Sequence, residues 1–523
     1  MKKRFNVTGT CIPEKHYMVN ISDKLNRILK LVNNEEYFII NRPRQYGKTT
    51  TLYLLEKKLN SMENYLPIRI SFEAIDTESY SEVRKFLGSI MMQIVNYFRF
   101  SSNKEMYKFI KKNENQITTM NEFNSFITDL IEFSGKKVVL IMDEVDKSSN
   151  NQLFLDFIGM LRSKYLLRNE GKDYTFHSVI LAGVHDIKTL KLKIRPDEEH
   201  KYNSPWNIAV DFNVDMSFSP KEISTMLIEY SKDNSVNIEI EELSKEIYLF
   251  TNGYPFLVSR ICQIIDEKIN KDNKDHWDKS KVKQAVKIIN EEVNTLFESI
   301  VKNLENNHEL YELTKRILVD GEQIVFNPLD PTISIGLTYG IFKKGQNGLE
   351  ISNKIFEEII YNYMISKIRT SAKNMSLYNV KSSFIKENGE LNIEKVLQRF
   401  QQFMKEQYSS KDTEFLEHHG RLLFLAFIKP IINGVGFDFK EVQISEEKRL
   451  DLVITYNSFK YIIEMKIWRG PKYHEDGLKQ LCDYLDIHDL KKGYLLIFNF
   501  NKNKEFKEEK INIQGREIFQ VFV

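Results

Sequence analysis

An apolar stretch that runs directly into Gly47, Lys48 and Thr49 constrains this chain more than any other feature. Residues 37–55 read YFIINRPRQYGKTTTLYLL, which is a strand pattern, a short loop and then a helical pattern. The start of a helix presents free N–H groups and the positive end of its dipole to an anion. Gly47 lets the backbone approach phosphate oxygens, Lys48 carries charge for the β- and γ-phosphates, and the Thr49 hydroxyl can ligate Mg²⁺. The stretch therefore predicts a nucleoside triphosphate site.

The match to the phosphate-loop pattern lacks one residue, because Arg42 stands where G-x-x-x-x-G-K-[ST] has its first glycine. A chance turn before a helix is the alternative, and a second motif argues against it. Residues 137–146 read KVVLIMDEVD, an apolar run that suits a strand buried on both faces and that ends in carboxylates. We expect Asp143 to hold the Mg²⁺ shell and Glu144 to polarise a water for attack on the γ-phosphate. A solvated acidic loop is the alternative for this motif.

Composition sets the class of protein without naming a partner. The 523 residues are 42% hydrophobic and 28% charged, which predicts a globular protein of about three domains. The 75 basic and 73 acidic residues leave a net charge of +2, so a nucleic-acid surface would have to be local. Cys11, Cys262 and Cys482 form no CxxC pair, which argues against a disulfide framework or a structural zinc site.

The ends and the apolar stretches predict no membrane association. The N-terminal sequence MKKRFNVTGTCIPEKHYM is basic but is not followed by the apolar region of a signal peptide. The most apolar late stretch, residues 422–432, contains Lys429 and Pro430 and is too short to span a bilayer. We expect a cytoplasmic protein with no membrane partner.

Up to residue 218 the chain alternates strand-like runs with amphipathic helical stretches, the pattern of a parallel sheet with crossover helices. The expected strands are 37–41, 66–71, 138–142, 178–182 and 209–214, with the third and fourth at the centre of the sheet. His185 follows the fourth strand, at the edge where open α/β sheets bind ligands. It is either a sensor of the γ-phosphate or a hydrogen-bonding residue of the fold.

The middle of the chain divides into two predicted modules. Residues 219–306 read as a helical lid that is interrupted at Asn252-Gly253-Tyr254-Pro255, where Gly253 tolerates positive φ and Pro255 can open a helix. The stretch 275–306 within it reads as one continued charged helix. Residues 307–370 give helices, a strand pair around Gly345 to Gly348 and a final helix, which favours a winged helix; such a module binds DNA in some proteins and packs against protein in others.

Residues 371–523 carry a second group of charged residues. The sequences RLDLVITY (449–456) and KYIIEMKIW (460–468) flank Asn457-Ser458 and predict a hairpin. Glu464 and Lys466 are two apart, so they share one face of their strand, and Asp451 on the neighbouring strand can reach them. Mg²⁺ or Mn²⁺ between Asp451 and Glu464 would activate a water, with Lys466 stabilising the charge on a phosphate. An edge-strand salt bridge is the alternative.

Several further residues are weaker candidates near this group. Glu441, Glu417 and Gln480 can add ligands or water contacts, whereas His418 and His419 read as capping or packing residues.

With these residues in view, the first two thirds of the chain resemble the AAA-like P-loop ATPases of the STAND branch, and the end resembles a PD-(D/E)XK nuclease. The resemblance implies an α/β fold with the P-loop parallel sheet, a helical lid with a winged helix, and a C-terminal α/β nuclease-like domain. It implies ATP and Mg²⁺ as cofactors, and it places Asp451, Glu464 and Lys466 in the D, E and K positions. The implied nucleotide-binding residues are Arg44, Gln45, Tyr46, Gly47, Lys48, Thr49, Thr50, Asp143, Gly253 and Pro255. No arginine finger is identified; Arg195 and Arg260 are the candidates, the latter as a sensor on the lid helix.

Three functions fit this combination. The first is an ATPase that controls a metal-dependent nuclease acting on nucleic acid, DNA above RNA, in defence or in the control of mobile elements. The second is a nucleotide-dependent switch or interaction protein whose nuclease-like domain does not cleave. The third is a protein-remodelling ATPase. A second copy of the chain or an activating protein is the expected protein partner.

Overall fold

The fold is described from a computed structural model. It describes residues 2–148, 151–184, 206–270, 276–319, 322–371, 384–408, 413–432, 436–439, 452–456, 459–501 and 504–523. The chain divides into two compact units: one comprises residues 1–306, 326–344 and 350–356, and the other residues 307–325, 345–349 and 357–523. Within the described ranges no helix is both long enough and apolar enough to cross a bilayer.

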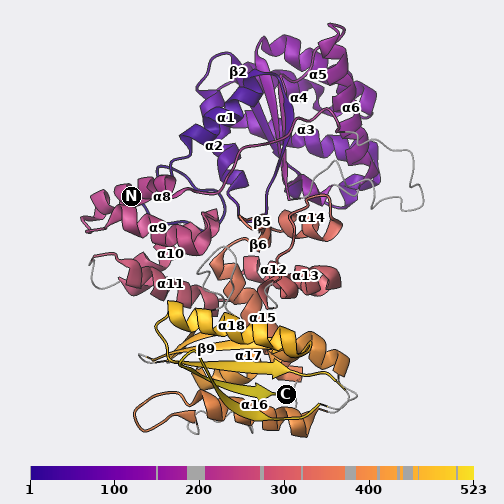
Figure 1. The fold of residues 1–523 in the computed structure, drawn as a ribbon. Helices are drawn as coiled ribbons and strands as arrows, with labels where there is room; N and C mark the ends of the chain where they lie inside the picture. The colour runs from indigo at the N-terminus through magenta and orange to yellow at the C-terminus, as the bar shows by residue number, and fades with distance from the viewer. Residues whose placement is uncertain are drawn as a thin grey trace. The chain divides into compact units, whose positions relative to one another are not determined.

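The first unit is built on a parallel sheet of four strands in the order β1-β4-β3-β2. Its strands are β1 (Tyr37–Asn41), β2 (Tyr65–Ser71), β3 (Lys137–Asp143) and β4 (Ser178–Gly183). Helices flank the sheet, as Figure 1 shows. They are α1 (Ser22–Asn33), α2 (Lys48–Asn60), α3 (Val83–Arg99), α4 (Lys104–Asn113), α5 (Met120–Ser134) and α6 (Gln152–Asn169). The prediction that 138–142 and 178–182 form the central strands is confirmed.

Strand alternation divides the sheet residues between two faces. Ile39, Ile68 and Leu140 belong to one apolar core, together with residues of α3, α4, α5 and α6. Their neighbours along each strand point to the other face, because successive side chains of a strand alternate. Arg69 and Asp143 lie on that second face. This division decides which polar residues can meet beside the phosphate loop.

The predicted fifth strand, 209–214, is wrong. The segment forms a single bridge, Val210 to Phe38, in which the Val210 N–H donates to the Tyr37 carbonyl at 2.9 Å. Beyond that bridge the carbonyls of Phe212 and Val214 accept hydrogen bonds from the Arg42 side chain, at 3.3 and 2.8 Å. A side chain therefore satisfies these backbone groups and no ladder forms.

Within the described residues of the first unit, the segment 219–306, for which the sequence predicts a lid, contains five α-helices. They are α8 (Pro220–Asn234), α9 (Ile240–Thr251), α10 (Pro255–Ile264), α11 (Lys279–Glu291) and α12 (Thr295–Asn306). The single helix expected over 275–306 is wrong, because the Asn294 side chain accepts from the N–H groups of Leu296 and Phe297 and so starts a new helix. This unit also holds α14 (Pro331–Thr338), β5 (Phe342–Lys344) and the end of β6 (Leu349–Ile351).

The second unit has a six-stranded mixed sheet in the order β11-β12-β10-β9-β8-β7. Its strands are β7 (Gly436–Phe439), β8 (Leu452–Tyr456), β9 (Phe459–Ile467), β10 (Lys492–Phe498), β11 (Glu508–Ile513) and β12 (Arg516–Phe522). Its helices are α13 (His308–Leu318), most of α15 (Lys354–Ser371), α16 (Ile393–Gln407), α17 (Thr413–Ile432) and α18 (Pro471–Ile487). The predicted hairpin is confirmed, since β8 and β9 pair antiparallel with Leu452 opposite Ile463.

Helix α18 covers one face of this second sheet. Leu481, Tyr484 and Leu485 of the helix share an apolar core with Val453 and Ile462 of the hairpin. Ile462, Glu464 and Lys466 occupy every second position of β9, so their side chains point to the same face. Ile462 packs against α18, and the two charged residues therefore lie on the face that α18 covers. The helix therefore encloses them.

Candidate functional site

The loop between β1 and α2 has the conformation expected of a phosphate-binding loop. Gly47 precedes α2 with φ at +77°, in the left-handed region that favours glycine. Helix α2 then begins at Lys48, so its first N–H groups border the loop. Thr49 lies in the first turn, and the Thr50 hydroxyl accepts a hydrogen bond from the Cys11 N–H at 3.0 Å.

Lys48 is buried, with 7% of its surface exposed. Its Nζ donates to the carbonyls of Arg42 and Pro43, at 2.8 and 2.9 Å. Burial lowers the pKa of Lys48, against the opposing effect of nearby carboxylates, of which Glu144 is the largest. The carboxylates after β3 therefore act electrostatically on the ammonium of the phosphate loop.

The acids after β3 have different environments. Asp143 is 3% exposed, and its Oδ2 accepts from Nη2 of Arg69 at 3.1 Å. Glu144 adopts φ +55°, and burial raises the pKa of its carboxyl group, although the Lys48 charge opposes this. A raised pKa makes a carboxylate a stronger base, as a residue that polarises water requires. Asp146 accepts from the Val184 N–H and so contacts the chain just beyond β4.

The strand order explains how these groups come together. β4 lies between β1 and β3, and all three strands are parallel, so their carboxyl ends lie side by side at the same end of the sheet. Gly183 ends β4 beside Asp146, where an added Cβ would lie 2.8 Å from a carboxylate oxygen. A glycine there lets the acidic turn pack against the strand end.

The residue that departs from the phosphate-loop pattern has a structural role. The Arg42 guanidinium donates to the carbonyls of Phe212 and Val214 and lies 5.2 Å above the Phe212 ring. Burial lowers the pKa of Arg42. Arg42 thus holds the segment after β4 beside β1, a contact that glycine cannot make.

The Gly253-Tyr254-Pro255 turn lies against the phosphate loop. An added Cβ on Gly47 would be 3.8 Å from the Pro255 Cβ. The Tyr254 hydroxyl donates to the Arg44 carbonyl, and its ring meets that of Tyr46 edge-on with 4.8 Å between centroids. The turn therefore contacts the loop through main-chain and aromatic groups.

Two more contacts complete the surroundings of the loop. The Gln45 side chain donates to the Thr295 hydroxyl of α12 at 3.1 Å. Gly340 is adjacent to Pro43, whose Cγ would be 2.7 Å from an added Cβ. The sequence carries no signal for Gly340, because it stands almost 300 residues from the loop that it touches.

Replacing Gly253 tests the rigidity of the turn. An added Cβ would lie 2.1 Å from the Phe218 carbonyl oxygen, and φ is +72°, so Gly253→Ala meets both a clash and backbone strain. We expect a cost of roughly 3 kcal/mol in the free energy of unfolding. Gly135→Ala is the matched control, because its φ is +57° but a Cβ there meets nothing within 4 Å. Urea unfolding should show a much smaller loss for the control; equal losses would contradict the close approach at Gly253.

The candidate arginine on the lid has a protein partner. Arg260 in α10 forms an ion pair with Glu292, with Nη2 and Oε1 2.5 Å apart, and Lys268 contacts the same carboxylate at 2.9 Å. Its role as a sensor stays a prediction. His185 and Arg195, the other candidates near the nucleotide, lie outside the described residues.

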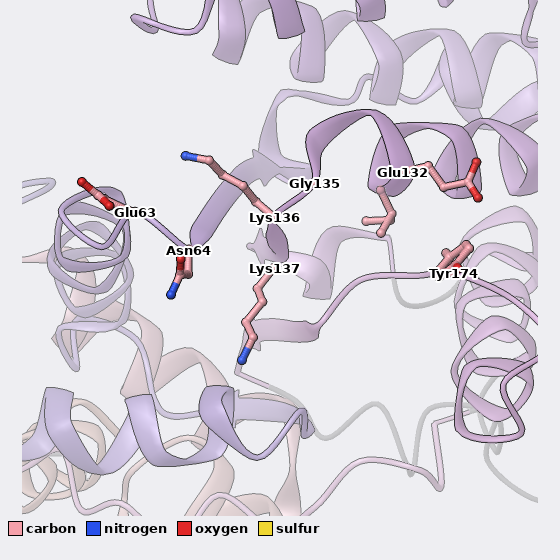
Figure 2. Close-up of a pocket in the computed structure, with 8 residues that line it drawn as sticks. Glu63, Asn64, Glu132, Gly135, Lys136, Lys137 and Tyr174 are labelled. Carbon is pink, nitrogen blue, oxygen red and sulfur yellow. The ribbon is translucent and has the colours of Figure 1, made fainter.

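A separate hollow lies at the other end of the strands of the first sheet. It is open to solvent and has a volume of about 1090 Å³, and Figure 2 shows Glu63, Lys137 and Tyr174 among its lining residues. Lys137 begins β3, so the hollow is at the amino ends of the strands. Ligands of open parallel sheets bind at the carboxyl ends, which separates this hollow from the phosphate loop.

The second group of charged residues lies in the second unit. Glu464 is fully buried, and its Oε1 is 2.8 Å from Nζ of Lys466. Lys466 also donates to Oε1 of Gln480 in α18 at 3.0 Å, and Gln480 donates to the Tyr484 hydroxyl at 3.1 Å. Sequence reasoning named Gln480 but missed Tyr484; its four-residue spacing from Gln480 on a helix was the available signal.

The remaining candidates of this group are placed only in part. Asp451 and Glu441 lie outside the described residues. Glu417 and His418 belong to α17, with side chains outside the described part, and His419 is partly buried in the same helix. Among the described residues, no group of three or more His, Cys, Asp or Glu side chains is arranged to hold a metal ion.

Oxygen donors at both places suit hard cations. The Thr49 hydroxyl and the Asp143 carboxylate are the donor types that Mg²⁺ prefers beside a triphosphate, and Asp143 already balances one cationic group. Glu464 supplies a carboxylate at the second place.

One family model matches the part of the chain that contains the phosphate loop and the acids after β3. Residues 19–361 match the family described as AAA-like domain. A WD repeat-containing protein of Synechocystis sp. is 20% identical over 340 residues, which are 62% of this chain; the chain spans only 27% of the length of that relative.

Among solved structures, the Walker-type ATPase PABY2304 of Pyrococcus abyssi has a TM-score of 0.47 and 12% identity, covering 68% of this chain and 99% of that one. The ORC2 protein of Aeropyrum pernix has a TM-score of 0.38 and 10% identity, covering 70% and 97%. Cdc6p of Pyrobaculum aerophilum has a TM-score of 0.33 and 15% identity, covering 69% and 98%. With its family match over more than half of its length, the chain belongs to the AAA-like domain family of P-loop ATPases.

Proposed function

We propose that the chain binds and hydrolyses ATP, and that its nucleotide state controls a metal-dependent nuclease formed by the C-terminal residues. The observation that carries the ATPase part is the buried Lys48 ammonium beside Glu144, Asp146 and Asp143. The proposed segments are 1–218 for the ATPase domain, 219–306 for the lid, 307–370 for a winged helix and 371–523 for the nuclease-like domain.

The proposed ATPase chemistry uses residues of one sheet edge. Lys48 and the N-terminus of α2 bind the β- and γ-phosphates, and Glu144 accepts a proton from the attacking water. Thr49 and Asp143 would hold Mg²⁺, which when bound neutralises phosphate charge. The Tyr254 contact with the Arg44 carbonyl gives the lid a direct link to the loop, through which phosphate binding would change the lid.

The proposed nuclease chemistry rests on the enclosed ion pair. Lys466 lies between Glu464 and Gln480, which fixes the position of its ammonium next to the buried carboxylate. Asp451 and Glu464 would hold Mg²⁺ or Mn²⁺, which when bound lowers the pKa of a water. Nucleic acid, with DNA above RNA, is the proposed substrate; defence or control of mobile DNA rests on the family resemblance alone.

A nucleotide-dependent switch without cleavage is the second candidate. The ion pair between Lys466 and Glu464 favours it, because that pair by itself balances the charge of the buried carboxylate. In this reading the C-terminal domain binds a partner and does not cut.

Cleavage measured under different nucleotide conditions separates the candidates. DNA and RNA are incubated with the full chain, Mg²⁺ or Mn²⁺, and either ATP, ADP or a non-hydrolysable analogue. We expect cleavage that requires the metal and changes at least about fivefold between nucleotides, as a coupling between sites of ordinary size gives. Asp451→Ala should remove cleavage and leave ATP turnover unchanged.

Wild-type protein that turns over ATP but cuts neither nucleic acid under any condition would favour the switch. ATP turnover stimulated by a protein and not by nucleic acid would instead point to a remodelling ATPase.

A further inference from the structure

Arg69 is a charged residue in the middle of an otherwise apolar buried strand, YLPIRIS. Its guanidinium contacts two carboxylates on different elements. Nη2 is 3.1 Å from Oδ2 of Asp143 at the end of β3, and Nη1 is 3.6 Å from Oε2 of Glu56 in α2. The motifs of the phosphate loop and of the acidic turn do not include Arg69.

The local geometry keeps this guanidinium where it is. Arg69 and Asp143 lie on the same face of adjacent parallel strands, with Ser71 of β2 in register with Asp143. Glu56 stands seven residues after Thr49, two turns further along the same side of α2. The Tyr97 hydroxyl hydrogen-bonds to Glu56, and burial, followed by the Glu56 charge, raises the pKa of Tyr97.

Asp143 is buried, and its two neighbours are partly buried. The exposed side-chain fractions are 4% for Asp143, 20% for Arg69 and 19% for Glu56. A buried carboxylate needs a compensating positive charge. Arg69 supplies it to Asp143, the residue at which the proposed Mg²⁺ would place its own charge.

We propose that Arg69 is a positioning residue that sets the Mg²⁺ requirement of nucleotide binding, because it competes with the metal for Asp143 and is itself divided between Asp143 and Glu56. Without metal, Arg69 neutralises Asp143. When Mg²⁺ and nucleotide bind, Glu56 retains the guanidinium. The inference rests on the proposed nucleotide site and adds to it a residue that is shared between two carboxylates.

Opposite shifts for two substitutions test this division. The midpoint of thermal unfolding is measured for the full chain with ADP or a non-hydrolysable ATP analogue while Mg²⁺ is varied, so that no turnover is needed. Arg69→Met removes the competitor. The Mg²⁺ concentration that gives half of the nucleotide-dependent rise in the thermal midpoint should therefore fall about tenfold, the ratio expected for one charged hydrogen bond. Glu56→Gln leaves Arg69 to Asp143 alone, and the concentration should rise about threefold.

Arg69→Lys keeps a positive charge but cannot contact both carboxylates as the guanidinium fork does, so its Mg²⁺ requirement should lie between those of wild type and Arg69→Met. A purely structural salt bridge predicts lower thermal midpoints for Arg69→Met and Glu56→Gln with no change in the Mg²⁺ requirement, or changes in the same direction, and would overturn the proposal. If Arg69→Met does not fold without metal, the comparison of Glu56→Gln with Arg69→Lys decides by the same criterion. A wild-type protein with no Mg²⁺-dependent nucleotide effect would overturn the nucleotide site as well.

Discussion

Lys48→Met is expected to lower ATP turnover at least about a hundredfold, the effect of removing one preorganised charge from a phosphoryl-transfer site. The Lys48 ammonium is buried and donates to two loop carbonyls, and the charges of Glu144 and Asp143 act on it. Methionine has a similar length but cannot meet the β- and γ-phosphates. Phosphate release and calorimetric ATP binding measure the two parts of the effect.

Stability distinguishes this loss from misfolding. Burial leaves the Lys48 charge poorly solvated, which lowers its pKa, and Asp143 keeps Arg69 as a compensating charge. Replacement by an apolar side chain should therefore change the free energy of unfolding by no more than about 1 kcal/mol. Because the pKa is lowered, the charge is also lost at a lower pH than in free lysine. ATP affinity should therefore decline on the alkaline side sooner than an ordinary lysine would allow.

Two further variants bracket the Lys48 result. Lys57 lies in the same helix but forms an exposed ion pair with Glu14. The Lys57→Met variant should therefore retain full ATP turnover. Glu144→Gln should bind ATP and turn it over slowly, because it keeps the phosphate contacts and loses the base. Normal turnover by Lys48→Met would remove the phosphate loop from the mechanism.

Lys466→Met is expected to abolish nucleic-acid cleavage and to destabilise the second unit by roughly 3 kcal/mol, because it takes the ammonium away from a fully buried carboxylate. Glu464→Gln should abolish cleavage too, but with a smaller loss of stability. Its partner Lys466 keeps 19% of its side chain exposed, so water can solvate the charge that remains. The two variants thus differ in stability and agree in activity.

Divalent cations add a readout that does not depend on cleavage. If Glu464 is a metal ligand, Mg²⁺ or Mn²⁺ should recover part of the thermal midpoint lost by Lys466→Met, since the cation replaces the missing positive charge. Glu464→Gln should not respond in this way. Lys460→Met on the same strand is the control, because Lys460 is exposed and contacts His488. If Lys466→Met cleaves at the wild-type rate, or if its thermal midpoint does not change with the cation, a structural salt bridge is favoured.

Residues close together in the chain account for what could be predicted. The strand, loop and helix around Lys48, the acidic end of β3 and the β8–β9 hairpin depend on periodicity and on residue types at short spacing. The wrong strand prediction also comes from relying on short spacing, which does not reveal contacts with distant residues. Residues 209–214 have a strand pattern, but their carbonyls accept from Arg42, which lies some 170 positions earlier.

The sequence by itself determined the phosphate loop, the acidic turn and the shared face of Glu464 and Lys466, because helix and strand periods place side chains without reference to the rest of the chain. Only the tertiary structure decided that β4 lies between β1 and β3, that Arg69 contacts Asp143 and that Gln480 holds Lys466. Those contacts depend on which elements become neighbours. That choice is made by burial of apolar surface over the whole unit, which no local pattern records.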